Sequence, residues 1–210
     1  MSEQRAVFVG AGTAGRGIAD LTSLAIARET GKTMEESRKQ IWLVDSLGLV
    51  VQSRIDVESH TMPQPFDKDV CRKIGEINRR PIIFALSNPT SKSECTAKEA
   101  YTFTDGKCMF ASGSPFDPVE IDGKLCVPGQ GNDSYIFPGV GLGVVAAGLT
   151  HVDDEIMIIA AKHTSQSAFY NNILHDVVYL LLLQGFKRGD TTVSKPENMT
   201  HYLQDFMHKP

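Results

Sequence analysis

The sequence predicts an α/β protein with a doubly wound parallel sheet and helices on both faces, and three observations carry this prediction. Short apolar runs alternate with helical periodicity through the first half of the 210 residues. The first run, at residues 6–9, breaks into glycines and is followed by a helical pattern. The run IWLV at residues 41–44 is apolar throughout, as expected of a parallel strand that is covered on both faces.

Local signals place the individual elements. Thr33 and Glu36 have the spacing of a capping box at a helix start, as do Thr96 and Glu99. The Asp-Gly pair at residues 122–123 separates two apolar runs and predicts a hairpin turn. In chain order we expect a strand at 6–9, helices at 14–28 and from 33, strands at 41–44 and 49–51, a loop at 53–67, a helix at 67–77, a strand at 82–86, a short helix from 96, strands at 108–111, 119–121 and 125–127, helices at 140–147, 153–167 and 173–183, and a loosely held polar tail at 187–210.

One strand is missing from this pattern. Half of a doubly wound sheet needs three strands joined by two helices. Residues 46–80 contain a single helical pattern and no strong central strand. We therefore expect the sheet to lack a central strand. We also expect marginal stability, because the strands beside the gap would have unpaired backbone groups, unless the strand at 82–86 pairs directly with the first strands.

The stretch VFVGAGTAGRG at residues 7–17 fits the pattern G-x-G-x-x-G between a strand and a helix. The first glycine allows a tight turn, the second lets the backbone approach a pyrophosphate, and the third lets helix and strand pack closely. The N–H groups at the helix start then bind phosphate. This Rossmann-like turn predicts phosphate-binding roles for Gly10, Gly12, Thr13, Ala14, Gly15 and Gly17.

Asp45 ends the next expected strand, where a carboxylate can accept hydrogen bonds from both hydroxyls of an adenosine ribose, and Ser46 follows it. These residues alone indicate an adenosine cofactor, and both a dinucleotide and S-adenosylmethionine fit. If the ligand is a dinucleotide, the sequence weakly favours NAD and leaves NADP as the alternative. A 2′-phosphate usually needs a neighbouring cation, and no Lys or Arg stands beside Asp45.

Composition narrows the function classes. The formal charge of −4 gives no reason to expect a nucleic acid or an anionic membrane as partner. The four cysteines lack the spacing of a zinc site or a disulfide framework, which favours reduced thiols in an intracellular protein. We see no secretory signal and no apolar run long enough to cross a bilayer, so we expect a soluble chain.

Five segments in this order resemble the NAD(P)-binding domain of the malic enzymes. They are VFVGAGTAGRGIAD, KQIWLVDSLGLV, RRPIIFALSNPT, CMFASGSPFDPV and VPGQGNDSYIFPGVGLGVVAAG. The resemblance covers most of residues 5–162 and fades after about residue 167. It implies a dinucleotide-binding domain over residues 1–167 and a divergent C-terminal helix and tail over residues 168–210.

The resemblance also implies site residues beyond the glycine turn. Asn88 matches a family asparagine near the nicotinamide and the substrate, and Asn132 matches the first residue of an Asn-Asn pair. Residues 112–114 are expected to shape the same cleft. Asp133 departs from the family asparagine, and its carboxylate would repel a substrate carboxylate. Gly139, Gly141 and Gly143 could form a second nucleotide turn, but we favour close helix packing.

Malic enzymes oxidise L-malate with NAD(P) and decarboxylate the product to pyruvate with Mg or Mn. The family's catalytic tyrosine and lysine and its metal-binding carboxylates lie upstream of the glycine turn, so we expect neither catalytic nor metal-ligating residues here. Some tens of family residues are also missing between Phe66 and Asp67. We expect dinucleotide binding, with a non-catalytic nucleotide- or partner-binding relative as the alternative. The resemblance leaves open a homo-oligomer and a cytoplasmic or mitochondrial location.

Overall fold

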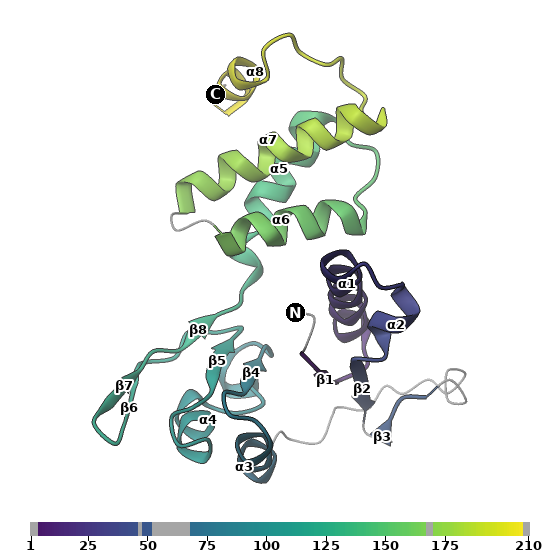
Figure 1. Ribbon diagram of the computed structural model, residues 1–210. Coiled ribbons are helices and arrows are strands. Elements are labelled where there is room, and N and C mark those ends of the chain that lie inside the picture. The colour runs from purple at the N-terminus through teal and green to yellow at the C-terminus, as the bar shows by residue number, and fades with distance from the viewer. Residues whose placement is uncertain (1–3, 46–47, 52–67, 167–169, 208–210) are drawn as a thin grey trace. The chain divides into compact units, whose positions relative to one another are not determined.

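The computed structural model describes residues 4–45, 48–51, 68–166 and 170–207, and it has the expected α/β architecture of parallel strands and helices (Figure 1). The chain divides into two compact units, Met1–Asn132 and Asp133–Pro210. All of the described strands belong to the first unit, whereas the described elements of the second unit are helices. The loop expected at residues 53–67 lies outside the described residues.

The first sheet is built around the parallel pairing of β1 with β2, in which Ala6 faces Ile41 and Val9 faces Val44. The short edge strand β3 pairs antiparallel with β2. Two helices connect β1 to β2, and each begins close to the residue that the sequence predicts. The elements are β1 (Ala6–Val9), α1 (Thr13–Thr30), α2 (Met34–Arg38), β2 (Ile41–Asp45) and β3 (Gly48–Leu49).

The second sheet has the order β4-β5-β8, and both of its pairings are parallel. Among the described strands, no pairing joins it to the first sheet, which is consistent with a missing central strand. Residues 119–126 form an antiparallel hairpin beside it. The elements are α3 (Lys68–Ile77), β4 (Ile82–Ala85), η2 (Thr90–Lys92), α4 (Ala97–Phe103), β5 (Met109–Ser112), β6 (Val119–Ile121), β7 (Lys124–Cys126) and β8 (Gly129–Gln130).

The core of the second sheet lies between its strands and helices α3 and α4. Ile83 and Ala85 of β4 are buried there, and the rings of Tyr101 and Phe110 meet edge to face at 6.0 Å. Burial raises the pKa of the Tyr101 phenol to about 12. Phe84 alternates with the buried residues of β4 and is 62% exposed. The strand therefore has one covered and one open face in the described residues.

The local sequence signals of the first unit are confirmed. Both capping boxes form, because Thr33 and Thr96 each accept a hydrogen bond from the N–H of the glutamate three residues later, and that carboxylate accepts one in return. Asp122 and Gly123 have φ of +49° and +76°, as a two-residue hairpin turn requires.

The second unit packs three helices closely and adds a fourth. A Cβ on Gly139 would lie 3.0 Å from Val177, and one on Gly143 would lie 2.7 Å from Leu181, so the expected close helix packing is confirmed at these two glycines. Gly141 has no heavy atom within 4 Å of such a Cβ. The elements are η3 (Asp133–Tyr135), α5 (Phe137–Ala147), α6 (Asp154–Gln166), α7 (Tyr170–Arg188) and α8 (Met199–Met207).

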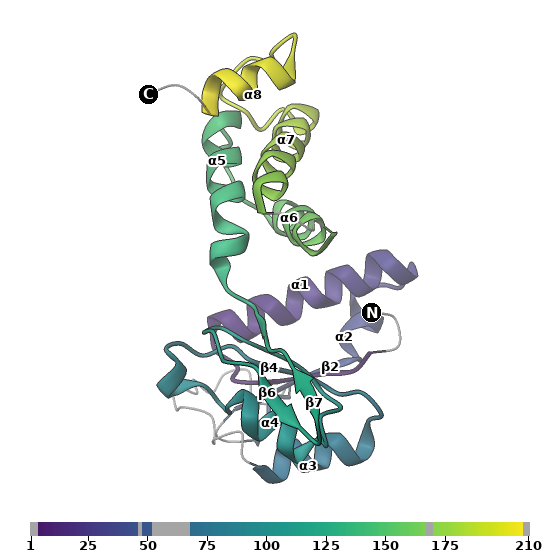
Figure 2. The same cartoon turned by 90° about the vertical axis from the view of Figure 1, so that its left-hand side faces the viewer.

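The expectation of a loose tail from residue 187 is wrong for its last part. Helix α8 packs on α5 and α7 (Figure 2). Leu203 is fully buried there, and the Tyr202 hydroxyl donates to the Ala146 carbonyl at 2.7 Å. The unit boundary follows packing and lies after Asn132, because α5, α6 and α7 share their cores. The boundary expected after residue 167 followed the family resemblance, and as a functional division it stays a prediction.

Asp153 joins two helices of the second unit. Its Oδ1 accepts from the Ile156 N–H at 3.1 Å, and its Oδ2 accepts from Arg188 in the last turn of α7. Burial alone would raise the pKa of Asp153, but the hydrogen bonds from Ile156 and Arg188 outweigh it and lower the pKa. Ionised Asp153 therefore stabilises the folded chain.

We predict that Gly143→Ala destabilises the chain by about 1–3 kcal/mol, because the added methyl group overpacks against buried Leu181. Gly141→Ala is the matched control, and it should stabilise α5 by about 0.5–1 kcal/mol because alanine is the better helix former. Urea unfolding of both variants measures the difference. Equal midpoints would contradict the described packing of α5 on α7.

We predict that Asp153 adds to the pH dependence of stability. An aspartate with a lowered folded pKa stabilises the fold above its unfolded pKa of about 3.9 and loses this contribution as the pH falls through the folded pKa. The free energy of unfolding, followed from pH 6 down to pH 3, should therefore fall less steeply for Asp153→Asn than for the wild type. Asp154→Asn is the control, and a variant slope equal to that of the wild type would contradict the role of Asp153.

Candidate functional site

The glycine turn has the geometry that its three glycines predict. Gly10 has φ of +116°, in the region that favours glycine, and its N–H donates to the Val44 carbonyl at 2.7 Å. Gly12 is the N-cap residue of α1. A Cβ on Gly15 would lie 2.0 Å from the Gly10 carbonyl oxygen, so only glycine permits this approach of helix to turn.

The N-terminus of α1 is suited to an anion. No side chain caps it, and its first turn contains no acidic residue. Gly12, Thr13, Ala14 and Gly17 are exposed, and a Cβ on Gly12 or Gly17 would meet no heavy atom within 4 Å. The first N–H groups of a helix lack partners within the helix, and the helix dipole favours negative charge there. A phosphate therefore fits this end of α1.

The β1–β2 register brings Asp45 to the same edge of the sheet as the turn. Val9 faces Val44, and the Gly10 amide continues the pairing by donating to the Val44 carbonyl. Asp45 is the next residue after Val44. Asp45 is half-buried and also pairs with Gly48 of β3. The structure therefore brings together the turn and the acid that the sequence predicts, whereas Ser46 lies outside the described residues.

The expected cleft residues form a second group, at the carboxyl ends of β4, β5 and β8. The Ser114 hydroxyl donates to Asn88 Oδ1 at 2.6 Å, and Asn132 Nδ2 donates to the Gly113 carbonyl at 3.0 Å. The Ser112 hydroxyl donates to the Ser114 carbonyl. The structure brings these five residues together, while their roles toward a ligand stay predictions.

Sequence reasoning missed Glu94. Its carboxylate accepts two hydrogen bonds from Ser87, one from the backbone N–H at 3.2 Å and one from the hydroxyl at 2.5 Å. Ser87 directly precedes Asn88, so Glu94 fixes the start of the loop that carries this asparagine. No motif connects residues at this separation, and only the fold of the loop around η2 brings them together.

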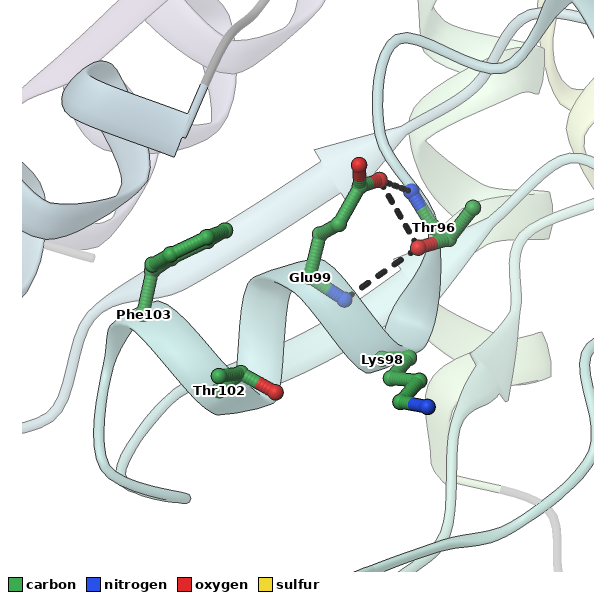
Figure 3. A pocket seen from close by; sticks show the side chains of 5 residues that line it. All are labelled: Thr96, Lys98, Glu99, Thr102 and Phe103. Carbon is green, nitrogen blue, oxygen red and sulfur yellow. Dashed lines mark hydrogen bonds between the residues drawn. The ribbon is translucent and has the colours of Figure 1, made fainter.

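A hollow lies beside α4. Five residues line it: Thr96, Lys98, Glu99, Thr102 and Phe103 (Figure 3). The hydroxyl of Thr96 and the carboxylate of Glu99 bond each other and the backbone at the start of α4, and these bonds lower the pKa of Glu99. Two of the polar residues that line the hollow, Thr96 and Glu99, therefore already serve the capping box.

Two absences concern residues 4–45, 48–51, 68–166 and 170–207. In that part of the chain, no group of three or more His, Cys, Asp or Glu side chains is arranged to hold a metal ion. None of the helices found there is long and apolar enough to cross a membrane.

Parallel strands, a glycine turn at a helix N-terminus and an acid at the end of the next strand define the class of dinucleotide-binding α/β domains. The sequence profile of the malic enzyme NAD-binding domain matches residues 1–64 and 59–183. The chain belongs to this family.

The compared relatives are longer proteins. The chain is 37% identical to the NADP-dependent malic enzyme of Vitis vinifera and covers 44% of it, and it is 41% identical to NADP-dependent malic enzyme 3 of Arabidopsis thaliana over 85% of the chain and 36% of that protein. The crystal structure of Entamoeba histolytica malic enzyme matches the fold over 99% of the chain and 47% of its own length, with a TM-score of 0.67 and 18% identity. The chain thus spans less than half the length of these proteins.

The comparisons confirm the expected internal deletion. The alignment with the Vitis vinifera protein extends over 257 positions, whereas the chain has 210 residues. That relative therefore has some tens of residues that this chain lacks. The two profile matches meet at residues 59–64, close to the expected position between Phe66 and Asp67.

We predict that Gly15→Ala destabilises the first unit by about 1–3 kcal/mol, because the methyl group would collide with the Gly10 carbonyl oxygen. Gly17→Ala, two residues further along α1, meets no atom and should stabilise the helix slightly. Thermal unfolding without ligand compares the two variants. Similar melting temperatures would show that the turn does not need glycine at position 15.

Proposed function

We propose that this chain binds an NAD(P) dinucleotide, with the pyrophosphate at the N-terminus of α1 and the adenosine ribose at Asp45. The close approach of Gly15 to the Gly10 carbonyl carries this proposal. It holds the first turn of α1 against the end of β1, beside the acid that ends β2. A phosphate bound there would accept hydrogen bonds from the backbone N–H groups of Thr13 and Ala14.

We propose that this binding serves the reaction that the resemblance to the malic enzymes implies, the oxidative decarboxylation of L-malate to pyruvate and CO2. Oxidation of malate needs a base for the hydroxyl proton, and loss of CO2 needs a cation to polarise the keto group. The described residues contain no arrangement that fits a metal ion, so we derive no metal step from them. The proposed contribution of this chain is to hold the dinucleotide, with Asn88 and Asn132 near its reactive end.

Asp133 favours a second candidate, a relative that binds the nucleotide without turning over malate. This exposed carboxylate stands beside Asn132, where the resemblance implies a second asparagine. A carboxylate repels the carboxylates of malate, whereas an asparagine amide can donate to them. In this candidate the dinucleotide site is retained and the substrate site is altered.

The choice between NAD and NADP is part of the proposal. The lack of a Lys or Arg beside Asp45 favours NAD, but the curated relatives compared above are named NADP-dependent. We propose NADP as the first dinucleotide to test, with NAD measured in parallel. Calorimetric titration of the same preparation with both ligands compares their affinities directly.

We predict that Asp45→Ala weakens dinucleotide binding about tenfold, the scale of a lost hydrogen bond to a charged group. Asp20→Ala is the control, because it removes an exposed acid from the same unit, where it pairs with Arg38 on the surface. Calorimetry measures both. An Asp45→Ala affinity equal to that of the wild type would refute the ribose role. Malate turnover with manganese by the wild-type chain would exclude the non-catalytic candidate.

A further inference from the structure

The loop after β4 is held at both ends of Asn88. On one side, Glu94 accepts two hydrogen bonds from Ser87, at 3.2 Å from the amide and 2.5 Å from the hydroxyl. On the other side, Oδ1 of Asn88 accepts a hydrogen bond from the Ser114 hydroxyl at 2.6 Å. The two anchors come from different segments, one following η2 and one following β5.

The second anchor is itself buried and fixed. Ser114 is 9% exposed, and its carbonyl accepts the hydroxyl of Ser112, which is fully buried. A Cβ on Gly113 would lie 2.8 Å from both Asn88 Oδ1 and Asn88 Nδ2, so the amide plane lies against the bare backbone of Gly113. Asn88 therefore has a defined amide orientation although its surface is exposed.

This arrangement separates the two ends of the Asn88 amide. Oδ1 accepts from Ser114, so the opposite end of the amide is the Nδ2 group, which donates. Its partner must then be an acceptor oxygen. In the proposed site, such an oxygen belongs either to the carboxamide of the nicotinamide or to a carboxylate of the substrate.

We propose that Glu94 and Ser114 are positioning residues that present Asn88 Nδ2 to an acceptor oxygen of the bound ligand. Neither residue touches the ligand in this proposal. Glu94 sets the backbone through Ser87, and Ser114 sets the side-chain amide. The inference rests on the proposed dinucleotide function and adds to it the residues that orient the nicotinamide end.

The test compares binding of NADP with binding of 2′,5′-ADP, which lacks the nicotinamide half. In the wild type, NADP should bind more tightly, and the ratio of the two affinities reports the nicotinamide contacts. Glu94→Gln and Ser114→Ala should each reduce this ratio about threefold to tenfold, as expected for a misplaced hydrogen bond, and leave the affinity for 2′,5′-ADP unchanged. A purely structural defect would weaken both ligands together.

Two control variants accompany the test. Glu99→Gln makes the same chemical change in the capping box of α4 and should keep the wild-type ratio, since Glu99 bonds Thr96 and not Ser87. Ser87→Thr keeps both donors to Glu94 and should also keep the ratio, whereas Ser87→Ala removes the hydroxyl and should lower it. If Glu94→Gln does not fold, Ser87→Ala tests the same contact between Ser87 and Glu94.

Titration of L-malate onto the dinucleotide complex identifies the source of the acceptor oxygen. If a variant lowers the ratio of the NADP affinity to the 2′,5′-ADP affinity, the acceptor is the carboxamide. If a variant weakens only the binding of L-malate, the acceptor is a substrate carboxylate. Variants that change neither step would overturn the positioning role.

A ligand-free measurement separates this inference from the proposed function. In NMR spectra, Glu94→Gln should shift the Ser87 amide and the Asn88 side-chain NH2 signals, and Glu99→Gln should not. Unchanged Asn88 signals would refute the positioning role whatever the chain binds. A wild-type chain that binds neither nucleotide would instead refute the proposed function.

Discussion

The hydrogen bond from the Gly10 amide to the Val44 carbonyl, at 2.7 Å, is the constraint on which the candidate site depends. It extends the parallel β1–β2 ladder by one residue beyond the last strand pair, Val9 with Val44. Since parallel strands end at the same edge of a sheet, this bond places the glycine turn beside Asp45. The turn can then reverse direction tightly enough for α1 to start at Thr13, but only because Gly15 has no side chain.

The second sheet also has a candidate site at the carboxyl ends of paired strands, but this one is formed by side chains and not by a helix N-terminus. The loops after β4 and β5 lie at the carboxyl ends of paired strands, and the amide of Gly113 continues their ladder by donating to the Ala85 carbonyl at 3.1 Å. Here the polar contacts run between loops, from Ser114 to Asn88 and from Asn132 to the Gly113 carbonyl. Ligand sites in open α/β sheets form outside the carboxyl ends of the strands, and both groups occupy such positions.

The sequence could predict features that depend on neighbouring residues. The capping box of Thr33 and Glu36, the turn at Asp122 and the roles of Gly10 and Gly15 each depend on a few adjacent positions. Strand β8 was missed because its two residues, Gly129 and Gln130, pair with β5 through the backbone and carry no apolar pattern. The packing of α8 was missed because its short apolar stripe lies in a polar segment. The hydrogen bonds between Glu94 and Ser87 were missed because they depend on the fold of a loop.

The two units also differ in how far apart along the chain their contacts lie. In the second unit, the backbone hydrogen bonds of the described helices join residues about four positions apart, and the bond from Tyr202 to Ala146 adds a contact across 56 residues. In the first unit, the parallel pairing of β1 with β2 joins residues that are separated along the chain by both α1 and α2. Proteins rich in local contacts fold faster. On refolding from denaturant, the helical unit should therefore order first, which reverses the order in which the two units emerge during synthesis.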